Sequence, residues 1–273
     1  MNDSSHTRIA ILLTCFNRRE LTLSCLRSLQ DQRLPDNACL ELVLVDDNSH
    51  DGTTEAVRSL WAQASIIRGD GNLYWCGGMR VAWQAAAKTN PGYFLLVNDD
   101  TTLLPHAVEN LLSIVGPPSS GKIAVAPILD NKTKKLIYGG KYRKYVPVPV
   151  HGTPLPCDTF NANCALIPSY VYQRLGILHS AYTHSMGDYD YGFAARRAGF
   201  EIIQAGEPLG FCNENSESGS WRDPSLSRST RLRLLQSPKG LPWREWLDYT
   251  RRNEGPLWPV KFVSPILRIL LGK

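Results

Sequence analysis

Apolar residues in the first hundred positions form short, nearly continuous runs that alternate with amphipathic stretches. The runs predict buried strands, and the stretches, in which apolar residues recur at helical spacing, predict helices between them. The predicted strands are residues 9–14, 40–45, 65–68 and 93–97, and the predicted helices are residues 19–32, 53–63 and 77–88. Alternation of this kind is typical of βαβ units, so we predict an α/β fold with a mainly parallel central sheet and helices on both faces.

The pattern loosens after about residue 120. Residues 131–156 predict an irregular or β-hairpin excursion, and two further helices are expected at residues 168–175 and 191–198. The one clear change in composition falls near Trp221. We therefore divide the chain into an α/β domain at residues 1–220 and a basic, tryptophan-rich tail at residues 221–273.

Pairs of acidic residues follow two of the predicted strands. Asp46 and Asp47 come after the second strand, and Asp99 and Asp100 come after the fourth. Ligands of open α/β sheets bind beyond the carboxyl ends of the strands, so both pairs are expected at one crevice. Neighbouring carboxylates are costly unless a cation neutralises them, and oxygen ligands of this kind suit Mg²⁺ or Mn²⁺. The alternative is that Asp100 caps a helix beginning near residue 104.

Two other segments are candidates for binding or chemistry. Residues 69–78 combine four glycines with Tyr74 and Trp75, so the backbone can approach a ligand and the aromatic side chains can line a pocket. Their spacing matches neither a dinucleotide-binding nor a phosphate-loop motif. Asp188 directly precedes a predicted helix, where it serves either as a helix cap or as a general base.

Composition restricts the class of protein. With 43% hydrophobic and 20% charged residues, the chain has the composition of a globular protein rather than a disordered one. No apolar run is long enough to span a membrane, and the polar first eight residues predict no secretory signal. Seven cysteines without a CxxC pair suit reduced thiols, so we expect a cytoplasmic protein.

Six segments in a fixed order carry a resemblance to a known family. They are RIAILLTCFNR, ELVLVDDNSHDGT, GNLYWCGGMRVAW, YFLLVNDDT, TFNANCALIP and MGDYDYGFAARRAGF. Over roughly residues 8–215 the chain resembles family 2 glycosyltransferases of the GT-A fold, of the bacterial type that includes rhamnosyltransferases of surface polysaccharides. The resemblance implies inverting transfer of a sugar, with dTDP-rhamnose preferred and a UDP-sugar as the alternative donor, to a glycan or lipid-linked acceptor.

The resemblance also assigns residues to the donor nucleotide, to the metal and the catalytic base, and to the acceptor or sugar pocket. The donor nucleotide is assigned Thr14, Asn17, Asp46, Asp47 and Asp99. Asp100 is assigned to the metal and Asp188 is assigned as the catalytic base. The acceptor or sugar pocket is assigned Trp75, Gly77, Gly78, Asn161, Asn163 and Asp190. The chain departs from the family pattern in three places. Asn98 replaces the first acid of the DXD-type element, Gly187 replaces the acid before the base, and residues 210–213 lack the histidine of many relatives. A metal would then have fewer protein ligands, and Asp190 is a second candidate for the base.

Two other functions compete with this one. A nucleotidyltransferase of similar fold would carry a glycine-rich basic loop after its first strand, whereas residues 14–20 of this chain contain no glycine. A non-enzymatic binding module for sugar or nucleic acid would leave the ordered acids without a purpose.

The tail, in which Lys and Arg far outnumber Asp and Glu, predicts either a helix at the inner face of the cytoplasmic membrane or a helix that packs on the domain or on a second subunit. We expect a membrane surface or a homodimer contact, and no nucleic-acid partner.

Overall fold

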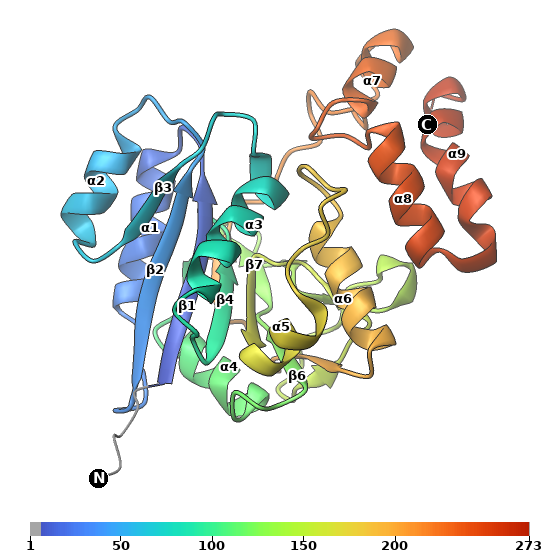
Figure 1. The fold of residues 1–273 in the computed structure, drawn as a ribbon. Helices are drawn as coiled ribbons and strands as arrows, with labels where there is room; N and C mark the ends of the chain where they lie inside the picture. Colours follow the sequence, from blue (N-terminus) through green and yellow to red (C-terminus); the bar gives the residue numbers. More distant parts are fainter. Residues whose placement is uncertain (1–6, 273) are drawn as a thin grey trace.

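A computed structural model describes residues 7–272 of the chain (Figure 1). Residues 1–6, which hold most of the polar segment used to predict the absence of a signal, lie outside the described residues. The chain folds around an eight-stranded sheet with the strand order β10-β13-β6-β12-β4-β1-β2-β3. Their bounds are β1 Thr7–Cys15, β2 Ala38–Asp46, β3 Ser65–Arg68, β4 Tyr93–Val97, β6 Lys122–Val125, β10 Leu155–Pro156, β12 Cys164–Pro168 and β13 Glu201–Gln204.

The sheet is parallel in the half that the hydrophobic pattern predicted and mixed elsewhere. Strands β3, β2, β1 and β4 all pair in parallel. Strand β12 runs antiparallel to both β4 and β6, and β10 runs antiparallel to β13. All four predicted strands are therefore confirmed, and the central strand β1 places its carboxyl end, Cys15, beside Asp46 of β2.

Helices cover both faces of the sheet, as predicted. On one face lie α1 (Arg19–Gln30), α2 (Thr53–Leu60) and α4 (Ala107–Val115), and on the other lie α3 (Tyr74–Ala87), α5 (Ser169–Leu175) and α6 (Gly187–Arg197). Strand β1 shows why: Ile9 and Ile11 point into the first hydrophobic cluster, whereas Ala10 and Leu12 point into the second. A sheet buried on both faces needs the nearly continuous apolar strands found in the sequence.

A smaller sheet lies beyond the end of β4. It has the order β5-β14-β7-β8, with bounds Thr102–Leu103, Gly210–Cys212, Ile128–Asp130 and Leu136–Tyr138. The segment predicted as an irregular or β-hairpin excursion, residues 131–156, begins with the turn and second strand of a hairpin, because β8 pairs antiparallel with β7 just before it. The chain then continues through β9 (Gly140–Lys141) and the 3-10 helix η1 (Arg143–Tyr145), and β9 pairs with β11 (Thr159–Phe160).

The C-terminal segment forms a helical group beside α6 (Figure 1). It consists of α7 (Arg228–Leu235), α8 (Trp243–Asn253), the 3-10 helix η2 (Gly255–Leu257) and α9 (Trp258–Leu270). Tyr249 of α8 is buried in a cluster with Cys76, Tyr182 and Phe193 of the α/β domain. Among the described residues, no helix is long and apolar enough to cross a membrane. All seven cysteines are free, and all except Cys39 are buried.

Candidate active site

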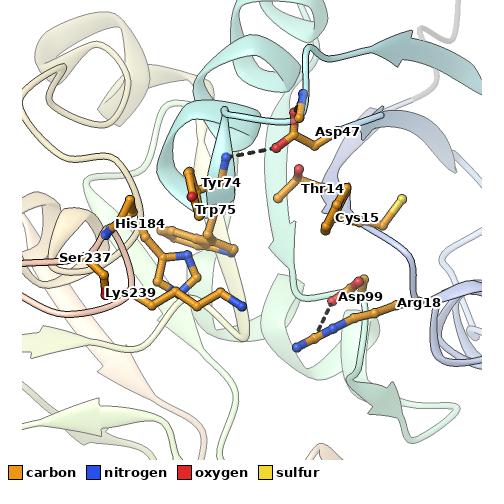
Figure 2. Close-up of a pocket in the computed structure, with 13 residues that line it drawn as sticks. Thr14, Cys15, Arg18, Asp47, Tyr74, Trp75, Asp99, His184, Ser237 and Lys239 are labelled. Carbon is orange, nitrogen blue, oxygen red and sulfur yellow. Dashed lines mark hydrogen bonds and ion pairs between the residues drawn. The ribbon is translucent and has the colours of Figure 1, made fainter. Parts of the chain in front are cut away.

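Two adjoining cavities open at the carboxyl ends of β1, β2 and β4. The first has a volume of about 420 Å³ and is lined by residues of the strand ends, of the loop before α3 and of the C-terminal segment (Figure 2). Those lining residues are Thr14, Cys15, Phe16, Arg18, Asp47, Gly71, Tyr74, Trp75, Asp99, His184, Ser237, Pro238 and Lys239. Asp47 and Asp99, one acid from each strand-end pair, line the same cavity, so the two strand ends converge as predicted.

The second cavity, of about 710 Å³, lies beside the first and extends toward α6 and the C-terminal segment. Its walls include Asp100, Asn161, Asn163 and Asp188. The two cavities share part of their lining, and the shared residues are Arg18, Trp75, Asp99, His184, Ser237 and Lys239. A ligand that fills both cavities would pass through this shared junction.

Asp47 holds the glycine-rich loop against the end of β2. Its two carboxylate oxygens accept hydrogen bonds from the backbone N–H groups of Gly71, at 2.8 Å, and of Tyr74, at 3.0 Å. Tyr74 begins α3 in a left-handed backbone conformation, with φ of 52°. The Asp47 carboxylate therefore fixes Tyr74 at the cavity wall. Asp47 lines the same wall.

Asp99 and Asp100 face the junction together with Arg18, from the loop after β1. One guanidinium nitrogen of Arg18 lies 3.2 Å from Asp99 Oδ1 and 3.0 Å from Asp100 Oδ2. Burial raises the pKa of Asp99 to about 7, against the opposing effect of the Arg18 charge. Two carboxylates are thus held close together and partly neutralised by a single cation.

The acid pair fits a divalent cation. Asp100 Oδ1 is buried and has no hydrogen-bond partner among residues 7–272, which leaves one carboxylate oxygen free for a ligand of opposite charge. Asp100 does not cap a helix, because α4 begins at Ala107 and its N-cap residue is His106. Within the described chain no group of three or more His, Cys, Asp or Glu side chains could hold a metal ion. Mg²⁺ and Mn²⁺ at such sites take further ligands from water and substrate phosphate.

Asn98, which stands at the first position of the DXD-type element, has a structural partner. Its side-chain oxygen accepts a hydrogen bond of 2.8 Å from the indole N–H of Trp75. This bond joins the end of β4 to α3 and orients the Trp75 ring at the junction of the cavities.

Asp188 lines the second cavity at the start of α6. This helix begins at Gly187, so Asp188 lies in its first turn and not before it. One carboxylate oxygen accepts a hydrogen bond of 3.2 Å from the Ala162 backbone N–H and the other accepts one of 2.8 Å from Tyr189. Burial raises the pKa of Asp188 to about 6, and these bonds oppose the shift. A carboxylate with such a pKa is ionised at neutral pH and is a stronger base than an exposed aspartate.

Asn161 and Asn163 both reach the second cavity. The side-chain amide of Asn161 donates to the Tyr189 hydroxyl at 3.0 Å, while its oxygen is buried without a hydrogen-bond partner among the described residues. That oxygen can accept a hydrogen bond from a ligand hydroxyl.

The structure corrects the assignment of Asp190. This residue is only 2% exposed and does not line either cavity. Its carboxylate pairs with the guanidinium group of Arg252 at 3.0 Å and accepts a hydrogen bond of 2.8 Å from Asn253. Both partners lie in α8, so Asp190 anchors the C-terminal segment to α6 and cannot reach a ligand as a base.

Four further predicted site residues do not line either cavity: Asp46, Gly77 and Gly78 are buried behind the walls, and Asn17 is exposed. Asn17 accepts a hydrogen bond from the His50 backbone N–H, and Asp46 accepts one from Ser49. Gly77 and Gly78 lie in α3 and do not line either cavity. A Cβ atom at Gly78 would lie 2.1 Å from Thr14 Oγ1, so glycine at this position lets α3 pack against the end of β1. These are corrections to a direct contact with ligand.

Sequence reasoning missed four residues of the junction. Arg18 follows the first strand, and no motif of the sequence assigns a role to Arg18 or to His184. Ser237 and Lys239 come from the tail, far from every acid pair, and no spacing in the sequence could place them here. Figure 2 shows all four around the same opening.

Comparison with known sequences now gives the class of protein. Residues 10–136 match the model of glycosyl transferase family 2. This segment, just under half of the chain, contains both strand-end acid pairs, and the match confirms the resemblance of the chain to family 2 glycosyltransferases. No curated protein sequence matches the chain.

Solved structures confirm the GT-A fold. The mannosyltransferase PcManGT from Pyrobaculum calidifontis, in complex with GDP-Man and Mn²⁺, is similar with a TM-score of 0.59 and 16% identity, over 97% of this chain and 73% of that one. S. aureus TarS 1-349 gives a TM-score of 0.61 with 11% identity, over 96% and 71% of the two chains. Its complex with UDP gives 0.58 with 10% identity, over 96% and 81%. At such identities the likeness establishes the fold alone.

Proposed function

We propose that this family 2 glycosyltransferase transfers a hexosyl or deoxyhexosyl group from a nucleoside-diphosphate sugar, with inversion, to a hydroxyl of a glycan or lipid-linked acceptor. The observation that carries the proposal is the order of groups across the two cavities. Aromatic and strand-end residues line the first cavity, the Asp99–Asp100 pair lies at or next to the junction, and Asp188 lies in the second cavity.

In this proposal the nucleoside occupies the first cavity, the diphosphate the junction and the sugar the second cavity. Asp188 takes the proton of the acceptor hydroxyl while the acceptor oxygen forms a bond to the anomeric carbon. The bond from that carbon to the diphosphate oxygen breaks on the opposite side, and the nucleoside diphosphate leaves with the bonding electrons. A single displacement of this kind inverts the anomeric centre.

Asp99 and Asp100 would hold Mg²⁺ or Mn²⁺. When bound, such an ion neutralises charge on the leaving diphosphate. The unpartnered Asp100 Oδ1 supports this assignment, and Arg18 shows that the pair already attracts a positive charge. The neighbour solved with GDP-Man and Mn²⁺ is a precedent on the same fold.

The donor sugar has three candidate nucleotide bases. The motif resemblance favours dTDP-rhamnose, whereas the similar structures were solved with GDP-Man and with UDP. A test therefore has to include all three bases.

The C-terminal helix α9 supports an acceptor at a membrane surface, which we place at the inner face of the cytoplasmic membrane. Val260, Val263, Leu267 and Leu270 recur at helical spacing and are all exposed, and Val260 is 68% exposed. An exposed apolar stripe with basic residues along the same helix suits the interface of an anionic bilayer.

The proposal is tested by calorimetry with dTDP, UDP and GDP and with their sugars, each with and without Mn²⁺, on the wild type and on Asp100→Ala. We expect one base to bind, more tightly with Mn²⁺, and the effect of Mn²⁺ to disappear in the variant. Asp36→Ala, at an exposed surface position, is the matched control. Folded wild-type protein that binds none of these nucleotides would overturn the proposal and favour a binding module.

A further inference from the structure

The junction between the two cavities brings together three side chains that can carry positive charge: Arg18, His184 and Lys239. They come from three separate parts of the chain, namely the loop after β1, the loop before α6 and the turn between α7 and α8. Figure 2 shows Lys239 extending beneath the His184 ring toward the pair formed by Arg18 and Asp99. A side chain neutralises an anionic ligand only if it is charged and its charge is not already compensated.

The charge of Arg18 is already compensated. Its guanidinium group contacts both Asp99 and Asp100, at 3.2 and 3.0 Å, and two carboxylates surround one cation. An incoming anion would have to break these ion pairs to use Arg18 fully.

His184 is not a cation near neutral pH. Burial and the nearby charges of Lys239 and Arg18 lower the pKa of His184 to about 4. The ring makes an edge contact with Tyr74, at 6.1 Å between centroids. Its Nδ1 atom is buried without a hydrogen-bond partner among residues 7–272. His184 can therefore accept or donate one hydrogen bond, but it contributes no positive charge.

Lys239 differs from both. It lines both cavities, and it forms no ion pair with any residue in the described part of the chain. Its charge is therefore available to a ligand at the junction.

The turn that carries Lys239 is held firmly. The Gly240 backbone N–H bonds to the Ser237 carbonyl at 2.8 Å, and Leu241 bonds to Leu235 at 2.6 Å. A Cβ atom at Gly240 would lie 2.3 Å from the carbonyl oxygen of Leu234, so only glycine lets the turn close on the end of α7. The Gln236 side chain accepts a further bond from the Trp243 backbone at 3.0 Å. The backbone at Lys239 is thus held at a fixed place.

We propose that Lys239 binds the diphosphate of the donor and stabilises it as a leaving group, so that the C-terminal segment supplies a binding residue of the active site. The inference rests on the proposed function. A lysine ammonium group is suited to this role as a compact charge with three donors.

The test compares binding of a nucleoside diphosphate with binding of the nucleoside of the same base, without added metal. The diphosphate is whichever of dTDP, UDP and GDP the wild type binds most tightly. In Lys239→Met we expect the Kd for the diphosphate to rise about 10- to 100-fold, the loss of one charge-assisted contact, and the Kd for the nucleoside to stay unchanged. Lys239→Arg keeps the charge and should recover most of the affinity. Lys122→Met, at an exposed position at the start of β6, is the matched control.

The outcomes separate the two proposals. If the wild type binds a diphosphate and Lys239→Met binds it equally well, the role of Lys239 is wrong and the proposed function stands. Equal losses for diphosphate and nucleoside would mean that the residue only supports the fold of the turn, which also overturns the inference. If the wild type binds no diphosphate, with or without Mn²⁺, the proposed function fails, and the inference fails with it.

Discussion

The first cavity has two walls that come from different parts of the chain. One wall consists of strand ends, with Thr14 after β1, Asp47 after β2 and Asp99 after β4. The other consists of the turn between α7 and α8, with Ser237 and Lys239. The first wall follows directly from the order of strands in a parallel sheet, whereas the second depends on how a C-terminal helical group packs. The comparison teaches that the visible motifs describe only half of the site.

The C-terminal segment, which carries the second wall, is attached to α6 and to the loop before it by polar contacts of α8. Glu245 of α8 accepts hydrogen bonds from the backbone and the hydroxyl of Thr183, at 3.0 and 2.8 Å. Arg252 of the same helix pairs with Asp190 of α6 at 3.0 Å. Since Thr183 precedes His184, the tail also holds the loop that carries a junction residue. The C-terminal segment therefore packs on the α/β domain and contributes to the lining of both cavities.

The largest expected effect is that of Asp188, in the second cavity at the start of α6. Asp188→Asn keeps the shape of the side chain and removes its basicity, so we expect kcat to fall by about 10³-fold while donor affinity changes little. Turnover and calorimetry on the same preparation measure the two quantities. Asp36→Asn, on the surface, is the control. Retained turnover together with lost donor binding would show that Asp188 is a binding residue and not the base.

The same residue sets the expected pH dependence. Because the pKa of Asp188 is raised to about 6, the ionised and active form accumulates as the pH rises through 6, and it is lost as the pH falls below 6. The rate of the wild type at saturating donor should follow this curve in a series of buffers of equal ionic strength. A rate that is flat between pH 5 and 7 would contradict Asp188 as the base.

A second prediction breaks the ion pair that holds α8, and with it the C-terminal segment, on α6. Arg252→Met leaves the carboxylate of Asp190 buried without its cation, so we expect the free energy of unfolding to fall by about 3 kcal/mol. Denaturant unfolding measures the change, and Arg244→Met, exposed at the start of α8, is the control. Adding Asp190→Asn to Arg252→Met should restore part of the loss, because the buried charge is then removed as well. If the losses in free energy of unfolding of the two single variants simply add in the double variant, Asp190 and Arg252 are not coupled.

The difference between the walls also explains what the sequence could predict. Strand β1 needs apolar residues on both faces, so Ile9 to Leu13 identify it, and the acid pairs after β2 and β4 follow from chain order alone. Asp190 resembles a site residue because it lies in the first turn of α6 two positions after Asp188. Only its contact with Arg252 shows that it is structural, and such a contact depends on packing between distant segments. The same holds for Lys239.

The smallest expected effect concerns the outer surface of the second wall. Val260 and Leu267 lie on the exposed stripe of α9, and burying such side chains in a bilayer interface contributes about 1 kcal/mol or more each. We expect the double variant Val260→Gln/Leu267→Gln to bind vesicles of phosphatidylcholine and phosphatidylglycerol about tenfold more weakly than the wild type, in a sedimentation assay. Leu21→Gln, an exposed leucine of α1, should not change binding. If the wild type does not bind these vesicles but forms a dimer, and the double variant is a monomer, the stripe is a subunit contact. The tail would then bind a second copy of the chain rather than a membrane, while its inner side still completes the active site.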